Sequence, residues 1–457
     1  MARGNGEEPQ VNVDADQHQT SESNAPNAGT NKAPRLHRFA CIATDFCYFI
    51  AVLVTSPIWL VRMIVTGKIK TDWSARLGAG LILRRTARPR VLLHAVSVGE
   101  VNAIRGLVER LAADRLRPEL VISVTTDTGF SRAMSIFGAS HTVVRTPFDF
   151  TFAMRNWFDR IEPDLLLLVE LELWPNMTRL AESREIPVIV VNGRLSDRSI
   201  VRYRRVRRFV TGMFARAGIV LAQNRVYADR FAELGAPEVV VSGNMKWDSI
   251  ALADDVPGAA KLRTDLGVPK GVPLVVAGST EPGEELLLRE ALPDGARLII
   301  APRKPEWFDG VAANLPGCVR RSRQVNPGEG VTADTRFFVL DTIGELRMAY
   351  ALADVVVMGR SFGKLYGSDP IEPASLAKPV VIGPRVADFR DVVEAFLKSG
   401  GILQVDRESL ASALSELLAD PRRRAEIALR ARETIRREQG GTARTAELVL
   451  AVLATRA

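Results

Sequence analysis

The sequence predicts an α/β fold made of two parallel-sheet domains with a cleft between them, preceded by a membrane-associating helix. Short runs of Val, Leu and Ile recur from residue 90 onward, with amphipathic stretches between them. These runs are continuously apolar, which is typical of parallel strands covered by helices on both faces. A segment rich in Asp, Pro and Gly at 254–273 divides the runs into two series. The 457 residues are enough for about two or three domains of ordinary size.

The N-terminal segment, residues 1–38, is predicted to be a disordered tail. Residues 1–35 contain no Leu, Ile, Phe, Trp or Tyr and are rich in Asn, Asp, Glu, Gln, Ser and Thr. Such a segment cannot bury enough apolar surface to offset the entropy that folding would cost it.

Residues 39–66 form a hydrophobic segment that we interpret as a membrane anchor. Its uninterrupted uncharged part runs from Phe46 to Val61, which is shorter than the roughly 20 residues that span a bilayer. Eight Lys and Arg residues but one acid follow between Arg62 and Arg90, a composition suited to the anionic inner leaflet. The anchor either spans the bilayer or is partly embedded in it, and a buried core helix is the alternative. If it spans, the basic flank puts the main body in the cytoplasm.

The rest of the chain is predicted to hold two domains, a linker and a C-terminal helix. The first domain covers 67–246, the linker 247–271 and the second domain 272–430. The helical stretch over 431–457 has no strand partner and is expected to pack across both domains. The predicted strands cover 91–96, 120–124, 164–169, 187–191, 219–222 and 239–241, and then 274–277, 297–301, 337–340, 355–358 and 380–382.

The composition argues against several classes of protein and site. Lys and Arg number 61 against 53 Asp and Glu, a net charge of +8. The basic residues are not interleaved with aromatic ones along one element, which argues against nucleic-acid binding. Three cysteines cannot form a disulfide framework, and no two of the four histidines lie at metal-ligand spacing. We therefore expect no metal site and no bound cofactor.

Polar residues in the first domain follow strand ends, where an open parallel sheet binds its ligands. After the first predicted strand, a loop of small residues leads into a helix that has Glu100 near its start. An acid at this position either takes part in ligand binding and catalysis or only stabilises the positive end of the helix dipole. Glu170 and Glu172 follow the fourth strand and, being two residues apart, are expected to face the same way. A structural ion pair is the alternative for these acids. Lys246 ends the domain and either points toward the cleft or is an ordinary surface lysine.

The second domain repeats this arrangement with cations and small residues. Arg303 and Lys304 stand at a strand end, which suits an anionic ligand. The small-residue loop at 277–285 precedes a helix and is suited to a phosphate. Glu372 lies in the first turn of a later helix, where a carboxylate can hold a pair of ribose hydroxyls. The second domain is therefore predicted to bind a phosphate-bearing ligand.

Together the motifs resemble one family of enzymes. In chain order, HAVSVGE, ELWPN, RLS, LAQN, GNMKWD, PRKPE, GEL and PIEPA resemble motifs of the 3-deoxy-D-manno-octulosonic acid (Kdo) transferases, over about residues 46–435. These enzymes glycosylate a lipid A precursor. The resemblance implies a GT-B-type fold of two Rossmann-like domains with an N-terminal membrane-associating segment.

The resemblance also implies a reaction, a location and a site. Kdo would pass from CMP-Kdo to lipid IVA, a lipid A precursor, in lipopolysaccharide core biosynthesis at the inner (cytoplasmic) membrane, with the catalytic domains facing the cytoplasm. Glu100 would be the general base, and Glu170 and Lys246 would stabilise the transition state. No metal or cofactor is required. The residues implied to bind the CMP of the donor are Pro302, Arg303, Ile343, Gly344, Glu345, Asp369, Pro370, Ile371 and Glu372.

One loop departs from the family pattern. Where the family has GGHNPLEP, this chain has residues 366–369 before PIEP, so that Ser368 replaces the histidine and Asp369 the asparagine. An added negative charge near a nucleotide phosphate weakens binding unless a cation such as Lys364 or Arg360 offsets it. Two alternatives follow, a transferase with another nucleotide-sugar donor and an inactive membrane-associated relative. The retained acids and cations of the implied site favour an active Kdo transferase.

Overall fold

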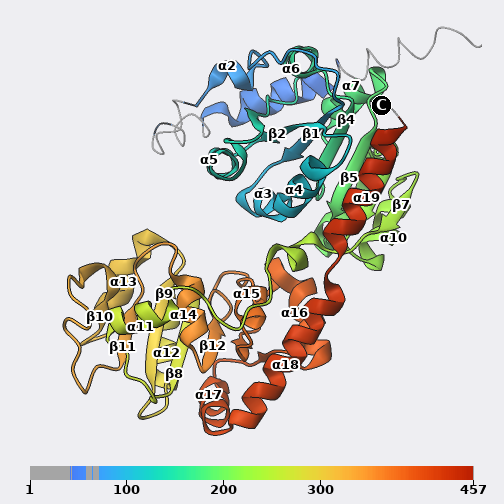
Figure 1. Cartoon of the computed structure of the whole chain (residues 1–457). Helices are drawn as coiled ribbons and strands as arrows, with labels where there is room; N and C mark the ends of the chain where they lie inside the picture. Colours follow the sequence, from blue (N-terminus) through green and yellow to red (C-terminus); the bar gives the residue numbers. More distant parts are fainter. Residues whose placement is uncertain (1–41, 43, 58–63, 65–70, 456–457) are drawn as a thin grey trace, which may run out of the picture.

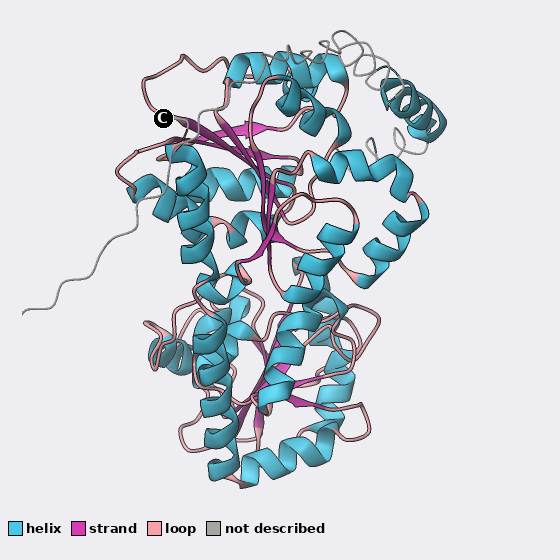
Figure 2. Ribbon diagram, turned by 90° about the vertical axis from the view of Figure 1, so that its right-hand side faces the viewer, coloured by secondary structure: helices cyan, strands magenta, loops and turns pink. Residues whose placement is uncertain are grey.

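The computed structural model describes residues 42, 44–57, 64 and 71–455 and shows two parallel α/β domains (Figure 1). Each domain is built on a seven-stranded sheet, in the orders β3-β2-β1-β4-β5-β6-β7 and β10-β11-β9-β8-β12-β13-β14. Figure 2 shows both sheets with helices on either side. The prediction of two parallel-sheet α/β domains is confirmed.

The first sheet is covered on both faces because its central strands carry buried apolar residues that point to both sides. Along β1, Leu92 joins one buried cluster while Val91 and Leu93 join the cluster on the opposite face. The strand β1 pairs with both β2 and β4, so the loops after β1 and β4 are neighbours at one edge of the sheet. The strands are β1 (Arg90–Ala95), β2 (Glu119–Val124), β3 (Thr142–Arg145), β4 (Leu165–Val169), β5 (Val188–Gly193), β6 (Ile219–Ala222) and β7 (Val239–Val241). The helices are α2 (Trp73–Arg76), α3 (Val98–Ala103), α4 (Arg105–Ala113), α5 (Asp127–Phe137), α6 (Thr151–Ile161), α7 (Pro175–Ser183), α8 (Asp197–Arg205), α9 (Arg207–Ala215) and α10 (Arg225–Glu233).

The second sheet has the same design, with β8 paired to both β9 and β12. The strands are β8 (Leu274–Thr280), β9 (Arg297–Pro302), β10 (Val319–Arg320), β11 (Phe337–Val339), β12 (Val355–Met358), β13 (Val380–Ile382) and β14 (Leu403–Gln404). The helices are α11 (Ala259–Leu266), α12 (Glu284–Ala291), η3 (Pro305–Trp307), α13 (Phe308–Ala313), η4 (Arg321–Arg323), α14 (Leu346–Leu352), α15 (Ile371–Ser375), η5 (Ala387–Phe389), α16 (Arg390–Ser399), α17 (Leu410–Ala419) and α18 (Pro421–Glu438).

Two segments connect the domains, and the carboxylate of Asp248 in one segment accepts hydrogen bonds from the other. The chain leaves the first domain through η2 (Met245–Ser249) and returns between α18 and α19 (Gly441–Ala454), as Figure 1 shows. Over the predicted C-terminal helix the structure has two helices, because Gly440 has a φ of 100° that a helix cannot continue through. Asp248 accepts hydrogen bonds from the backbone N–H groups of Gly440 and Thr442, both at 2.7 Å. The two crossings therefore form one hinge.

The described part of the N-terminal region contains a helix over 44–57, docked on the first domain by polar contacts. Asp45 accepts hydrogen bonds from the Thr151 N–H (3.0 Å) and the Asn176 side-chain amide (2.9 Å). The Tyr48 hydroxyl donates to Asp149 at 2.9 Å. Among the described residues, we find no helix with the length and apolarity needed to cross a bilayer. The predicted tail over 1–38 lies outside the described residues.

Candidate active site

Glu100 lies at the edge of the first sheet, directly after the loop that follows β1. It occupies the first turn of α3, which Ser97 caps. The Glu100 carboxylate accepts hydrogen bonds from the Ser97 hydroxyl (2.7 Å) and from the Val96 N–H (2.8 Å). The Ser97 hydroxyl oxygen in turn accepts a hydrogen bond from the Glu100 N–H at 3.4 Å. The arrangement resembles a capping box, except that the carboxylate accepts from the N–H of Val96 instead of that of the capping residue. The residue is 8% exposed.

Burial is the main cause that raises the pKa of Glu100, to about 7. The Val96 and Ser97 hydrogen bonds oppose the shift, and the negative charges of Glu170 and Glu172 add to it. A carboxyl group with a pKa near 7 is suited to general-base catalysis at neutral pH.

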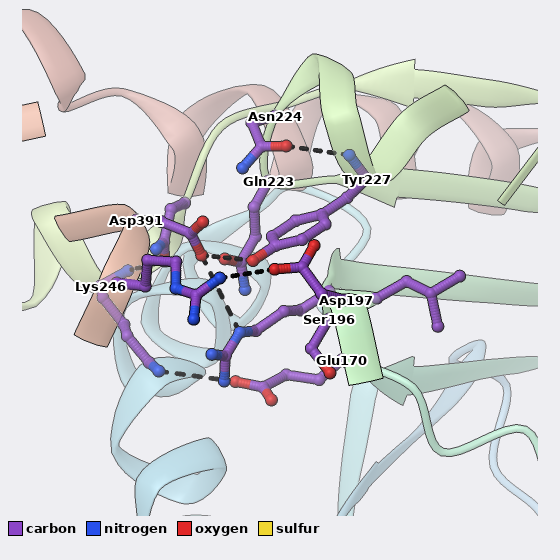
Figure 3. A network of polar contacts seen from close by, with 12 residues as sticks. Glu170, Ser196, Asp197, Gln223, Asn224, Tyr227, Lys246 and Asp391 are labelled. Carbon is purple, nitrogen blue, oxygen red and sulfur yellow. Dashed lines mark hydrogen bonds and ion pairs between the residues drawn. The ribbon is translucent and has the colours of Figure 1, made fainter. Parts of the chain in front are cut away.

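Glu170 and Lys246 form an ion pair beside Glu100. The Lys246 Nζ lies 3.7 Å from a carboxylate oxygen of Glu170, and both side chains are about one-fifth exposed, at 23% and 21%. Glu170 has a φ of 59°, in the left-handed region that is costly for a residue with a side chain. Lys246 is held on η2, where Asn244 accepts a hydrogen bond from its N–H at 3.0 Å. Figure 3 shows the two side chains facing each other.

The prediction that strand alternation makes Glu170 and Glu172 face the same way was wrong about its cause. The strand β4 ends at Val169, so a turn rather than strand alternation places the two carboxylates. Glu172 accepts a hydrogen bond from the Trp174 indole N–H at 2.8 Å. Burial raises the pKa of Glu172, and the charge of Glu170 adds to the rise. Three carboxylates therefore share one edge of the first sheet.

The implied donor residues of the second domain fall into two groups. The charges of Arg303, Asp369 and Glu372 all act on the buried Tyr350 hydroxyl. Burial raises the pKa of Tyr350, the charges of Glu372 and Asp369 add to the rise, and that of Arg303 opposes it. Glu372, at the start of α15, also lies 3.8 Å from Arg347 of α14. The other implied residues extend from this cluster: Pro302 ends β9, Pro370 and Ile371 start α15, and Ile343, Gly344 and Glu345 lie before α14, where Ile343 is 86% exposed.

Lys246 is the cation that offsets Asp369. Burial raises the pKa of Asp369, whereas its hydrogen bond from the Ile371 N–H (3.0 Å) and the charge of Lys246 lower it. Sequence reasoning proposed Lys364 or Arg360 for this role. Lys364 is exposed, and Arg360 lies 3.5 Å from Asp388 instead. The charge of a first-domain cation therefore acts on Asp369 and partly opposes the effect of burial.

The loop at 277–285 does not have the structure predicted for a phosphate cradle. The N–H groups of Glu281 and Gly283 donate to the carboxylates of Glu284 and Glu285, at 2.9 and 2.8 Å. Glu284 also accepts hydrogen bonds from the backbone N–H groups of residues 360, 361 and 362, at 2.8 to 3.0 Å. This acid therefore shapes the loop after β12 that leads to Asp369.

A cleft of about 790 Å³ lies between the domains next to the Glu170–Lys246 pair. Arg194, Tyr227 and Asp391 are among its lining residues. The Tyr227 hydroxyl donates to Asp391 at 2.5 Å, and the Arg194 Nε lies 3.9 Å from the same carboxylate oxygen. Sequence reasoning quoted the motif that contains Arg194 but assigned it no role.

Sequence comparisons identify the family. Residues 71–249 match the family described as 3-deoxy-D-manno-octulosonic-acid transferase (kdotransferase). A 3-deoxy-D-manno-octulosonic acid transferase of Bordetella pertussis is 32% identical over 378 residues, which cover 78% of this chain and 85% of the relative. The chain belongs to the Kdo transferase family. A Haemophilus influenzae enzyme of the same description is 29% identical over 79% of this chain and 86% of its own. The family resemblance is confirmed, and with it the prediction that the protein is a glycosyltransferase.

Solved structures support the two-domain fold of this Kdo transferase. A glycosyltransferase of Rickettsia africae has a TM-score of 0.55 at 13% identity, covering 80% of this chain and 98% of that one. UDP-GlcNAc 2-epimerase from Neisseria meningitidis has a TM-score of 0.53 at 12% identity, covering 80% of this chain and all of that one (100%). At these identities the similarity establishes the shared fold alone.

Proposed function

We propose that this protein transfers Kdo from CMP-Kdo to lipid IVA, with Glu100 as the general base. The observation that carries the proposal is the pairing of two features at one sheet edge. One is a buried carboxyl group whose pKa is raised to about 7. The other is an ion pair between Glu170 and Lys246, in which the charge of Glu170 acts on the Glu100 carboxyl group.

The proposed reaction uses these residues in one displacement. Glu100 takes the proton of an acceptor hydroxyl while the hydroxyl oxygen forms a bond to the anomeric carbon of Kdo. The bond from that carbon to the phosphate oxygen of the donor breaks, and CMP leaves with the electron pair. Lys246 and Arg303 then offset the negative charge that develops on the departing phosphate. Glu170 holds Lys246 and balances positive charge at the sugar.

The altered donor loop is compatible with this proposal. Asp369 accepts the hydrogen bond from the Ile371 N–H that an asparagine oxygen also could accept. Its extra negative charge faces Lys246. Loss of the family asparagine therefore does not by itself remove the hydrogen bond to the first residue of α15, and the charge of Lys246 partly offsets the added negative charge.

Membrane association through the N-terminal helix is part of the proposal. The side chains of Phe46, Phe49, Leu53 and Val54 are 60 to 69% exposed, while Asp45 on the same helix is bonded to the first domain. A helix that is docked on one side and apolar on the other is suited to lie in a membrane interface. The acceptor is itself a lipid, so we propose that the protein works at the cytoplasmic face of the inner membrane.

Asp369 also favours one alternative, a transferase that takes another nucleotide sugar. A carboxylate in place of the family asparagine changes the hydrogen-bonding groups near the donor, since a carboxylate only accepts whereas an amide also donates. A panel of nucleotide sugars separates the two possibilities. Turnover of a UDP-sugar without turnover of CMP-Kdo would replace the proposed donor.

The test of the proposed function is incubation of the full-length protein with CMP-Kdo and lipid IVA, with the product mass as readout. We expect a product heavier by one or more Kdo units. Glu100→Gln should lower the rate roughly 10²- to 10⁴-fold. Glu109→Gln is the matched control, because Glu109 is an exposed α4 acid that pairs with Arg105. Unchanged activity in Glu100→Gln would overturn the role of the base.

A further inference from the structure

Arg194 lies at the carboxyl edge of the first sheet beside Glu170. It directly follows β5, and β5 is paired with β4, which leads into Glu170. The Arg194 side chain is 24% exposed. Burial works against its charged form, yet Tyr227, Glu170 and Asp391 together hold the pKa of Arg194 above its usual value. Glu170 therefore has two cationic neighbours in its own domain, Lys246 and Arg194.

The contact that holds Arg194 comes from the other domain. Asp391 lies in the first turn of α16, and its carboxylate faces both Arg194 and the Tyr227 hydroxyl. Burial raises the pKa of Tyr227 to about 12, so this hydroxyl stays neutral and donates. Asn224 caps α10 by accepting from the Tyr227 N–H at 2.9 Å, which fixes the start of the helix that carries Tyr227.

The same helix of the second domain also reaches the turn that carries Lys246. Phe396, further along α16, packs edge to face on Trp247 with ring centroids 5.1 Å apart. Trp247 is the residue after Lys246 and is 3% exposed. Both cations next to Glu170 thus depend on α16, one through Asp391 and the other through Phe396.

We propose that Arg194 is a positioning residue for Glu170 and that α16 holds it in place from the other domain. Asp391 fixes Arg194 beside the Glu170 carboxylate, so that the charge arrangement around Glu170 and Lys246 depends on the docking of α16. This inference rests on the proposed role of Glu170 and Lys246 in the transferase reaction. The inference adds that the docking of the two domains is coupled to the charge arrangement of the Glu170–Lys246 ion pair.

A second ion pair across the same cleft provides a matched control. Arg390 of α16 lies 2.6 Å from Asp197 of α8, with side chains 52% and 59% exposed. Asp197 also accepts a hydrogen bond from Arg230. This outer pair joins the same two domains at the neighbouring residue of α16, but Asp197 makes no hydrogen bond or ion pair with Arg194 or Glu170 among the contacts of the described residues.

The test compares Asp391→Asn, the charge swap Arg194→Asp with Asp391→Arg, and the control Asp197→Asn. Hydrogen–deuterium exchange of the amides at 193–199 and 390–394 measures the docking of the two domains. Steady-state kcat and KM with CMP-Kdo and lipid IVA measure catalysis. We expect Asp391→Asn to speed exchange in both segments and to lower kcat roughly ten- to a hundredfold, with a smaller effect on KM for the donor. The control should change kcat less than about fivefold.

The charge swap separates positioning from docking. It restores an ion pair across the cleft, so slow exchange should return, but it puts an acid beside Glu170, so kcat should stay low. Recovery of kcat in the swap would show that Arg194 serves docking alone and would overturn the proposal, as would unchanged exchange in Asp391→Asn. If the wild-type protein consumes no CMP-Kdo, the proposed function fails, while the exchange data still decide whether Asp391 holds the domains together.

Discussion

Lys246 pairs with Glu170 at 3.7 Å, and its charge also opposes the rise that burial causes in the pKa of Asp369 in the other domain. One cation on the hinge segment therefore serves acids on both sides of the cleft. Glu170 and Asp369 are both partly shielded from solvent, so the stability of each carboxylate charge depends on neighbouring polar and charged groups. In the proposed site, Lys246 therefore links the acids of the first domain to those of the second.

We expect Lys246→Ala to lower kcat roughly 10²- to 10³-fold, because it removes a cation aimed at the charge that develops in the transition state. Lys246→Arg should retain part of the activity, since it keeps the charge but changes the geometry. Steady-state kinetics with CMP-Kdo and lipid IVA provide the measurement. Lys261→Ala is the control, because Lys261 is an exposed α11 residue paired with Asp265. Equal losses in Lys246→Ala and the control would contradict the assignment.

The raised pKa of Glu100 predicts the pH dependence of the reaction. The proposed base Glu100 would act as a carboxylate, so kcat/KM should rise with pH and level off above the pKa of about 7. The negative charge of Glu172 contributes to this shift. Removing that charge stabilises the Glu100 carboxylate, so Glu172→Gln should move the acid limb of the profile to lower pH.

A pH series of initial rates for the wild type and Glu172→Gln tests this prediction. Glu162→Gln is the control, because Glu162 lies at the far end of the first sheet, after α6 and before β4. It should leave the midpoint unchanged. A midpoint near the ordinary carboxyl value in the wild type, or a shift to higher pH in Glu172→Gln, would contradict the account of Glu100.

The sequence was sufficient to predict the parallel sheets and the edge where Glu100, Glu170 and Lys246 meet. Continuous apolar runs mark strands buried on both faces, and the carboxyl ends of parallel strands collect their loops at one edge. The spacing of residues in the sequence was a less reliable guide to side-chain direction just after the end of a strand. Glu170 and Glu172 follow the last residue of β4, so a turn with its own backbone geometry sets their directions.

Contacts between the domains could not be predicted in the same way. Tyr227 and Asp391 are 164 positions apart, and their contact depends on how two separately folded sheets close on each other. No periodicity within either domain encodes that arrangement. The cation facing Asp369 was missed for the same reason, because Lys246 comes from the other side of the cleft. The RLS motif that contains Arg194 was part of the family resemblance and was a signal that could have pointed to this residue.

Gly278 is required by the packing of Tyr350 behind the donor residues. A Cβ atom on Gly278 would lie 1.9 Å from the Tyr350 hydroxyl oxygen and 2.5 Å from its ring. Tyr350 is 1% exposed and has no room to move away. Gly278→Ala should therefore lower the free energy of unfolding of the protein by about 1–3 kcal/mol or more and disturb the loop that carries Arg303.

Thermal unfolding measured by calorimetry tests this effect. Gly310→Ala is the control, since a Cβ there meets no atom within 4 Å. The double variant Gly278→Ala with Tyr350→Leu should recover part of the loss, because leucine withdraws the ring and hydroxyl from the new methyl group. A Gly278→Ala protein as stable as the control would show that the strand yields more readily than this packing implies.

The exposed face of the N-terminal helix should govern binding to lipid. Phe46, Phe49 and Leu53 are 63, 60 and 62% exposed. Replacing all three by Ser removes most of the apolar area that this face can bury, at about 25 cal/mol per Å², but leaves the hydrogen bonds of Asp45 and Tyr48 to the first domain. Cosedimentation with vesicles that contain anionic lipid should therefore fall, while activity toward acceptor dispersed in detergent should be largely kept.

A matched triple variant in the second domain separates this effect from a general loss of surface hydrophobicity. Leu286, Val325 and Leu429 are 37, 87 and 55% exposed and lie far along the chain from the helix. Replacing these three by Ser should leave vesicle binding unchanged, because they do not share one docked apolar helix. Equal binding by both triple variants would contradict the proposed anchor. Loss of activity in detergent by the helix variant alone would instead assign the helix a part in building the first domain.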